Sequence, residues 1–352
     1  MIVSVIIPVY KVEQYIRRCV QSVIDQNSNG FNIECILVDD ASPDKSMDVV
    51  REMVDNYHGN TISFVVLHHD VNKGLSAARN TGTKAASGDY VFYLDSDDHM
   101  LENTLKRFVA FAIAYPKVDV IMGNSLCTGI NILTNTPVTN NNEYPMLLDD
   151  KQIMWELMLT RKLDHHAWNK LVKTSLIKEN NLMFDDGIIY EDIPWSYRLL
   201  FCVSSILIVP ELTYMYEYNP TSIIHTQSQK SHQLLNSFAF ICSSILINPP
   251  SPDPKGRLFV DHFIFIYHWM LIVADLERQY GVDEITKAKL NAIRIKIFTY
   301  AVCHFRIILA LYSLTLFPPM IYMIKFRPYR SNLNRIEKIV YRISKFGNKL
   351  RF

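Results

Sequence analysis

A cluster of carboxylates that could hold a divalent cation follows a short apolar segment around residue 90. The segment reads GDYVFYLDSDDHM and places Asp95, Asp97 and Asp98 within four residues of one another. Crowded carboxylates repel one another unless a cation lies between them. An Asp-x-Asp pair suits Mg²⁺ or Mn²⁺, which takes a few oxygens from the protein and completes its coordination with phosphates. The alternative is an acidic turn that caps a helix beginning at Leu101.

Two further polar clusters follow apolar segments that we expect to be strands. Asp39 and Asp40 follow the second strand, where a carboxylate can accept a hydrogen bond from a uracil N3 or a ribose hydroxyl. Lys73 and Arg79 follow the third strand and would place cations near phosphates. The alternatives are an Asx turn or helix cap for the aspartates and solvated basic residues at a helix start. Because the carboxyl ends of parallel strands converge on one crevice, the three clusters together favour a shared site.

The segments that must position these clusters alternate between strand and helix patterns. We expect five strands, at residues 2–7, 33–38, 62–67, 91–94 and 118–122. We expect intervening helices at residues 12–24, 46–56, 75–86 and 101–115. Such alternation predicts right-handed crossovers and an α/β fold, with a mostly parallel sheet flanked by helices.

The composition indicates a globular protein with a large core. The 352 residues are 49% hydrophobic and 12% aromatic, which argues against a disordered chain. Six cysteines are scattered without a C-x-x-C pair, so buried free thiols are expected rather than disulfides or a zinc site. The first residues, MIVSVIIPVY, lack the basic leader of a signal peptide. These features predict a cytoplasmic location.

Four segments together resemble the family 2 glycosyltransferases, which have the GT-A fold. They read SVIIPVYKVEQYIRRCVQSVIDQ, ILVDDASPDKS, NKGLSAARNTGTKAASGDYVFYLDSDD and IIYEDIPWSYRLL, and they cover about residues 1–220 in the family's order and spacing. Two positions depart from the common pattern, because the family often has Gly in place of Ala41 and an aromatic residue in place of His99. The resemblance implies a hexosyltransferase or N-acetylhexosaminyltransferase that moves a sugar with inversion from a nucleotide diphosphate sugar. The donor would be a UDP-sugar, and the acceptor a hydroxyl of a cell-surface polysaccharide or glycolipid.

The resemblance also implies which residues bind the donor. The residues carried over as binding the nucleotide sugar are Pro8, Asp39, Asp40, Lys73, Arg79, Asp95 and Ser96. The backbone around Pro8 and the carboxylate of Asp40 would hold the nucleobase, with Asp39 beside it. Asp97 and Asp95 would be the ligands of Mn²⁺ or Mg²⁺, with Asp97 the more direct one.

The catalytic residues implied by the resemblance lie in the segment Tyr190-Glu191-Asp192. Asp192 would be the general base and Glu191 would support it. This assignment suits the chemistry, because an inverting transfer needs one carboxylate within hydrogen-bond reach of the acceptor hydroxyl. The divalent ion would neutralise the negative charge that develops on the departing diphosphate.

Several aromatic and histidine side chains could shape the sugar and acceptor pocket. They are Phe184, Trp168, Trp195, His165 and His166. For the two tryptophans the alternative is packing in the core. For the two histidines the alternative is a polar loop, since no third residue stands at a spacing that would complete a metal site.

The same resemblance suggests how the chain divides into domains. Residues 1–225 would form the catalytic domain, with a nucleotide-binding half at 1–123 and an acceptor half at 124–225. Residues 226–352 would form a helical extension. The proline-rich segment 248–254 is the best candidate for a linker.

The C-terminal residues combine an apolar run with a basic segment. Residues 299–324 are almost uniformly apolar but are interrupted by Arg306 and by Pro318–Pro319. From Lys325 onward there are nine basic residues and one acidic residue, and apolar side chains would gather on one helical face. We expect this tail to lie on an anionic membrane surface at the inner face of the cell membrane. The alternatives are a helical lid on the catalytic domain and a helix that spans the membrane.

Two other functions are compatible with the fold. A binding or scaffold protein that no longer catalyses is disfavoured by the presence of Asp95, Asp97 and Asp192 together. A nucleotidyltransferase would be expected to carry a glycine-rich loop after the first strand, and PVYKVEQY contains no glycine. The expected partners are therefore a nucleotide-sugar donor and a saccharide or lipid-linked saccharide acceptor, and no nucleic acid.

Overall fold

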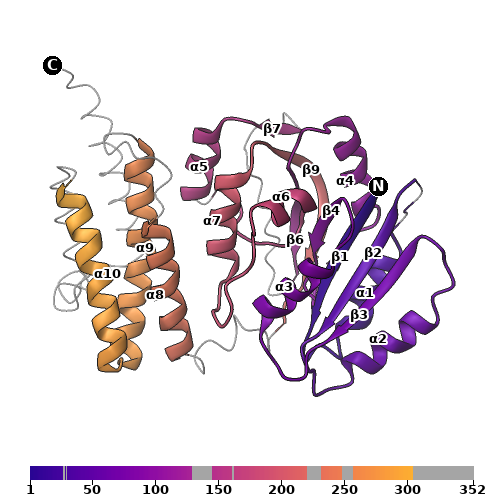
Figure 1. The fold of residues 1–352 in the computed structure, drawn as a ribbon, viewed down its shortest axis with the longest axis horizontal. Helices are drawn as coiled ribbons and strands as arrows, with labels where there is room; N and C mark the ends of the chain where they lie inside the picture. Colours follow the sequence, from indigo (N-terminus) through magenta and orange to yellow (C-terminus); the bar gives the residue numbers. More distant parts are fainter. Residues whose placement is uncertain are drawn as a thin grey trace. The chain divides into compact units, whose positions relative to one another are not determined.

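The computed structural model describes residues 1–26, 28, 30–128, 145–160, 162–219, 231–247 and 257–303. The chain forms two compact units, drawn in Figure 1. The first comprises Met1–Met154 and Lys162–Thr226, and the second comprises Trp155–Arg161 and Gln227–Phe352. The predicted linker and the predicted basic tail lie outside the described residues, as does the apolar run 299–324 beyond Cys303.

The first unit is an α/β fold built on one sheet, with helices between most of its strands (Figure 1). The strands are β1 (Ile2–Val9), β2 (Asn32–Asp39), β3 (Ile62–His68), β4 (Tyr90–Tyr93), β5 (His99–Met100), β6 (Val120–Cys127), β7 (Met146–Leu148), β8 (Lys170–Lys173) and β9 (Ile206–Tyr216). The helices are α1 (Ile16–Ile24), α2 (Ser46–Asp55), α3 (Leu75–Ala85), α4 (Thr104–Ala114), α6 (Thr174–Glu179) and α7 (Asp192–Cys202). A further helix, α5 (Lys151–Leu159), contains the boundary between the two units.

The sheet has the strand order β3-β2-β1-β4-β8-β6-β9-β5, and β7 pairs with β9. Its first four strands are parallel, as predicted, and so is the long pairing of β6 with β9. β8 lies between β4 and β6 and is antiparallel to both. The predicted fifth strand is β6, and it is separated from β4 because the later segment β8 inserts between them. The sheet is therefore parallel in its first half and mixed in its second half.

Burial on both faces explains why the first strands are continuous apolar runs. In β1, five apolar side chains have no exposed surface: Val3, Val5, Ile6, Ile7 and Val9. Helix α3 packs closely on this strand, since a Cβ added to Gly82 would lie 2.4 Å from a methyl carbon of Ile6. A larger residue at position 82 would push α3 away from the sheet. This close packing fixes the helix that carries Arg79.

Backbone hydrogen bonds bring the carboxyl ends of the first four strands together. The amide of Asp40 donates to the carbonyl of Val9 at 3.0 Å, and the amide of His69 donates to the carbonyl of Asp39 at 2.9 Å. The amide of Leu94 donates to the carbonyl of Ile6 at 3.0 Å. The three polar clusters identified in the sequence therefore follow strands that end at the same edge of the sheet.

The second unit contains three helices among its described residues. They are α8 (Ser231–Ile247), α9 (Arg257–Tyr280) and α10 (Glu284–Cys303). A buried ion pair between Arg294 and Glu277 links α10 to α9. None of the helices in the described part of the chain combines the length and the apolar character needed to cross a membrane.

The cysteines agree with the sequence prediction of free thiols. Free thiols are found at five described positions, Cys19, Cys35, Cys127, Cys202 and Cys242. Burial raises the pKa of the Cys19 and Cys35 thiols above the usual range, which keeps them protonated and unreactive at neutral pH.

Candidate active site

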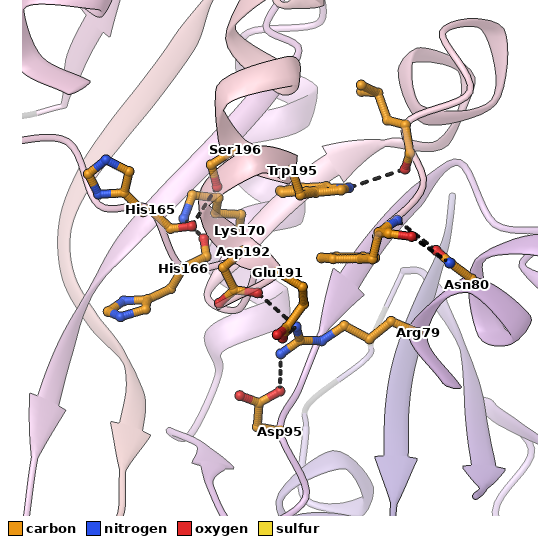
Figure 2. A network of polar contacts seen from close by, with 12 residues as sticks. Arg79, Asn80, Asp95, His165, His166, Lys170, Glu191, Asp192, Trp195 and Ser196 are labelled. Atoms are coloured by element: carbon orange, nitrogen blue, oxygen red, sulfur yellow. Dashed lines mark hydrogen bonds and ion pairs between the residues drawn. The ribbon is translucent and has the colours of Figure 1, made fainter. Parts of the chain in front are cut away.

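A single buried arginine joins three of the predicted site carboxylates. Arg79, on α3, donates from Nη1 to Glu191 Oε1 at 2.7 Å and to Asp192 Oδ1 at 2.8 Å. Its Nη2 donates to Asp95 Oδ1 at 2.7 Å, and Figure 2 shows the guanidinium between the three carboxylates. The guanidinium carbon also lies 5.1 Å from the centre of the Phe184 ring. Arg79 therefore fixes the start of α7 against the loop that follows β4.

The charges in this cluster are unbalanced. Arg79 is 1% exposed, and although burial opposes its charge, the three carboxylates raise the pKa of the guanidinium well above its usual value. Burial and the neighbouring charge of Asp192 raise the pKa of Glu191. One guanidinium thus contacts three carboxyl groups, and the pKa of one of them, Glu191, is raised to about 7. An added cation would be stabilised here by the excess negative charge.

Asp97 completes the Asp-x-Asp pair with Asp95. Its Oδ2 accepts a hydrogen bond from Asn219 Nδ2 at 2.9 Å. Burial and the charge of Asp95 raise the pKa of the Asp97 carboxyl, which indicates that the two carboxylates are crowded. No group of three His, Cys, Asp or Glu side chains in the described part of the chain could hold a metal by itself. The pair fits a divalent ion that takes its remaining ligands from phosphate oxygens.

Asp98, the third aspartate of the loop, has a structural role. Its Oδ2 accepts a hydrogen bond from Tyr214 Oη at 2.8 Å, and its Oδ1 accepts one from the Glu217 amide at 2.8 Å. Tyr214 Oη also accepts a hydrogen bond from the Asp95 amide at 3.2 Å. Burial, together with the charges of Asp97 and Asp95, raises the pKa of Asp98 well above its usual value. Asp98 thus ties the loop to β9 and the residues that follow it.

Asp40 is enclosed by its own loop. Its Oδ1 accepts hydrogen bonds from His69 Nδ1 at 2.7 Å and from the Lys73 amide at 2.8 Å. Its Oδ2 accepts hydrogen bonds from Asn72 Nδ2 and from the Gly74 amide, both at 2.8 Å. The residue is 2% exposed, and each oxygen already accepts two hydrogen bonds. Asp40 therefore holds the loop between β3 and α3 and has no acceptor position left for a nucleobase.

Asp39 is the more accessible of the two aspartates. Its Oδ1 accepts a hydrogen bond from the Ser42 amide at 2.8 Å, and its Oδ2 lies 3.1 Å from His68 Nδ1. Each of its oxygens therefore keeps capacity to accept another hydrogen bond. The geometry favours Asp39 over Asp40 as the direct contact to a nucleobase.

The predicted site residues form two groups in the structure. Arg79, Asp95, Glu191 and Asp192 are joined directly by hydrogen bonds, whereas Asp39, Asp40 and Lys73 gather where β2 and β3 end. Two other predicted residues are buried. Pro8 is buried and pairs in register with Val38, and Ser96 is buried in the loop after β4.

A further cluster contains His166 and Trp168, which the sequence offered as candidates for the acceptor pocket, together with Asp164 and Lys170, which it did not single out. His166 Nδ1 lies 2.7 Å from Asp164 Oδ1, and the His166 ring stacks on Trp168 with centroids 4.4 Å apart. Trp168 stacks in turn on Tyr214, also at 4.4 Å. The ammonium of Lys170 donates a hydrogen bond to the His166 carbonyl. The run DHHAWNK carries these residue types, but a polar loop would show the same pattern.

Lys170 is a buried cation of this cluster. It is 3% exposed, and burial lowers its pKa while the charges of Asp164 and Asp192 oppose that change.

The two tryptophans pack in the core, which was the alternative to a pocket role. Trp195 has no exposed surface and stacks on Phe184 with centroids 5.0 Å apart.

Comparisons with known proteins agree with the fold and with the family resemblance. Residues 4–177 match the family described as Glycosyl transferase family 2. The chain is 29% identical over 232 residues to the uncharacterized glycosyltransferase EpsJ of Bacillus subtilis, an alignment that covers 63% of this chain and 62% of EpsJ. It is 31% identical over 193 residues to a poly(ribitol-phosphate) beta-glucosyltransferase of Bacillus spizizenii, covering 53% of this chain and 27% of that protein. The aligned part thus spans less than two thirds of either relative.

A solved structure shows the same architecture. The crystal structure of residues 1–349 of S. aureus TarS with UDP-GlcNAc aligns with a TM-score of 0.61 and 21% identity. The alignment covers 85% of this chain and 89% of that one. This likeness confirms the predicted α/β fold of the GT-A type.

Proposed function

The chain belongs to glycosyl transferase family 2, and we propose that it transfers a sugar from a nucleotide diphosphate sugar to an acceptor hydroxyl. The observation that carries this proposal is the contact of Arg79 with both Asp95 and Asp192. It joins a candidate cation ligand at the end of β4 to a candidate base at the start of α7. A sugar donor bound at Asp95 would present its anomeric carbon toward Asp192.

The donor is proposed to be a UDP-sugar. Asp39 keeps acceptor capacity for the N3–H of a uracil. Lys73 is exposed, and its amide is hydrogen-bonded to the adjacent Asp40, so its ammonium is a candidate contact for a phosphate. A structure of TarS, which has the same fold, contains UDP-GlcNAc. The transferred group would be a hexosyl or N-acetylhexosaminyl unit.

Asp95 and Asp97 are the proposed protein ligands of Mn²⁺ or Mg²⁺. Asp95 uses only Oδ1 in its contact with Arg79, and Asp97 is crowded by Asp95. When bound, the ion would neutralise the charge on the diphosphate leaving group. Arg79 holds Asp95 in place, so the orientation of the carboxylate is fixed before the donor arrives.

Asp192 is the proposed general base. It is more exposed than Glu191, and Arg79 contacts its Oδ1, so Oδ2 is the oxygen proposed to take the proton of the acceptor. In the proposed transfer, Asp192 takes the proton of the acceptor hydroxyl while the oxygen of that hydroxyl forms a bond to the anomeric carbon. The bond to the diphosphate breaks, and its electron pair stays on the phosphate oxygen. Attack from the face opposite the leaving group gives inversion, and one base is enough.

We propose that the acceptor belongs to a cell-surface polysaccharide or glycolipid. One relative acts, by its name, on poly(ribitol phosphate), so a polyol phosphate chain is a further candidate acceptor. The catalytic domain would comprise residues 1–225, with a nucleotide-binding half at 1–123 and an acceptor half at 124–225. The helical extension would comprise residues 226–352. The basic residues from Lys325 onward would hold the enzyme at an anionic membrane surface on the cytoplasmic side.

A panel of nucleotide sugars tests the proposal. The chain is incubated with each donor and Mn²⁺, and release of the nucleoside diphosphate is measured with and without candidate acceptors. We expect release from at least one UDP-sugar, stimulated by an acceptor and abolished by chelation of the metal. Binding of donors without any release would favour a scaffold protein. Pyrophosphate release from a nucleoside triphosphate and a sugar phosphate would favour a nucleotidyltransferase.

A further inference from the structure

His166 is a half-exposed ring held in one orientation. Its side chain is 48% exposed, although one face of the ring is covered by the stacked Trp168. Its Nδ1 is fixed by Asp164 at 2.7 Å. No other described residue forms a hydrogen bond with Nε2, which is therefore available to a ligand. Because the ring is held on one face and at Nδ1, it loses little conformational entropy when a ligand binds at Nε2.

This ring is close to the proposed base. The charge of Asp192 contributes to the electrostatics of both His166 and Lys170. Figure 2 shows His166, Lys170 and Asp192 within the same polar network. An acceptor whose hydroxyl reaches Asp192 would therefore come within electrostatic range of His166.

The cations of this network differ in their access to a ligand. Arg79 is fully buried and already contacts three carboxylates, and Lys170 is buried and donates to a backbone carbonyl. His166 is the exposed one of these three. Although burial opposes it, the charge and hydrogen bond of Asp164 raise the pKa of the His166 ring. This shift favours the protonated ring, in which Nε2 also carries a proton and can donate a hydrogen bond.

We propose that His166 binds the acceptor, by donating a hydrogen bond from Nε2 to an anionic oxygen such as that of a phosphodiester. This inference rests on the proposed function, because it assigns the acceptor side of the same site. An anionic acceptor would be repelled by Asp192, Glu191 and Asp95 unless a cation lay next to its path. A charge-assisted hydrogen bond is also about twice as strong as a neutral one, so it discriminates in favour of an anion.

The test compares a charged probe with an uncharged one of the same carbon skeleton. His166 is followed by NMR through histidine labelled with ¹³C at Cε1, and its signal is assigned by its loss in His166→Phe. Glycerol 3-phosphate and glycerol are each titrated into the full chain, with and without UDP and Mg²⁺. We expect the His166 signal to shift with glycerol 3-phosphate and not with glycerol. The substitution His166→Phe keeps an aromatic ring on Trp168 and should weaken glycerol 3-phosphate binding by roughly tenfold.

The matched control is His58→Phe, at an exposed histidine between α2 and β3. It should leave glycerol 3-phosphate binding unchanged. No shift of the His166 signal, or an equal shift with glycerol, would overturn the proposal.

UDP affinity, measured by calorimetry on the same samples, distinguishes failure of the His166 proposal from failure of the proposed donor site. If the unmodified chain does not bind UDP, the proposed donor site is refuted. The glycerol 3-phosphate titration tests only the role of His166.

Discussion

Asp192 Oδ1 lies 2.8 Å from Arg79 Nη1, although 113 positions separate the two residues in the chain. The same guanidinium holds Asp95, so the proposed base and a proposed cation ligand share one buried partner. Arg79 therefore fixes the position of each carboxylate relative to the other. This shared contact accounts for a buried arginine in a site that we propose to bind phosphates without exposing Arg79 to them.

Replacing Arg79 should strongly destabilise the fold. Arg79→Met would leave Asp95, Glu191 and Asp192 without their cation, and breaking a buried pair from one side costs about 3–5 kcal/mol. Urea unfolding measures the difference. The control is Arg17→Met, which removes an exposed pair with Glu52 and should scarcely change the free energy of unfolding. Equal stability of Arg79→Met and the unmodified chain would contradict the role given to this cluster.

Replacing the proposed base should stop transfer but not donor binding. Asp192→Asn keeps the size of the side chain and loses the ability to take a proton, so the transfer rate should fall by about 10²–10⁴-fold. Calorimetry with UDP should give an unchanged affinity, because Asp192 addresses the acceptor. The matched variant is Glu191→Gln. If this variant loses transfer while Asp192→Asn keeps it, the base is Glu191.

The first half of the fold could be predicted from the sequence because its signals are local. Strands buried on both faces give unbroken apolar runs, so the strand expected at 91–94 is found as β4, Tyr90–Tyr93. β8 could not be predicted in this way. It is a four-residue strand that contains two lysines, and its place in the sheet depends on pairing with β4 and β6, which are distant in the sequence.

The same distinction applies to the site. The sequence placed Asp95 and Arg79 at the ends of successive strands, which is a consequence of topology. It did not predict that Arg79 binds Asp192, because that contact depends on how α7 packs against the sheet. Nor could it separate Asp39 from Asp40, since only the surrounding loop shows that the oxygens of Asp40 are occupied. The stack of His166 on Trp168 depends on tertiary contacts with Tyr214 in the same way.

The contribution of Glu34 to stability should depend on pH. Glu34 accepts hydrogen bonds from Ser4 Oγ at 2.5 Å and from the Ser87 amide at 2.9 Å. Although burial opposes it, these bonds lower the pKa of Glu34 below 4.5. A lowered pKa in the fold gives stability that is present above the unfolded value and is lost as the pH falls through the folded value.

The variant Glu34→Gln tests this dependence. It should be less stable than the unmodified chain at pH 7 by about 1–3 kcal/mol, since buried donors lose a charged acceptor. The difference should shrink as the pH falls below 4.5. Urea unfolding at several pH values measures it, and Glu102→Gln, at an exposed position, controls for the chemical change. A difference that stays constant with pH would show that Glu34 is not ionised in the fold.

The basic tail should bind anionic membranes. Nine basic residues and one acidic residue occur from Lys325 onward, and each basic residue near an anionic surface contributes about 1 kcal/mol. Sedimentation with phosphatidylglycerol vesicles should retain the full chain at low salt and less of it at high salt. A variant with glutamine in place of four basic residues should bind less: Lys338, Arg342, Lys345 and Lys349. Equal binding of this variant would support the helical-lid alternative.

Binding of UDP tests the account most directly, because it reports on the metal and nucleotide site without requiring the acceptor. Calorimetry is carried out with and without Mn²⁺ on the unmodified chain, on Asp97→Asn and on the control Asp55→Asn, an exposed position on α2. The account predicts UDP binding that strengthens with Mn²⁺ in the unmodified chain and in Asp55→Asn. It predicts that Asp97→Asn loses this Mn²⁺-dependent gain, because one anionic ligand of the bridging ion is removed. Mn²⁺-dependent UDP affinity that is unchanged in Asp97→Asn would contradict the account.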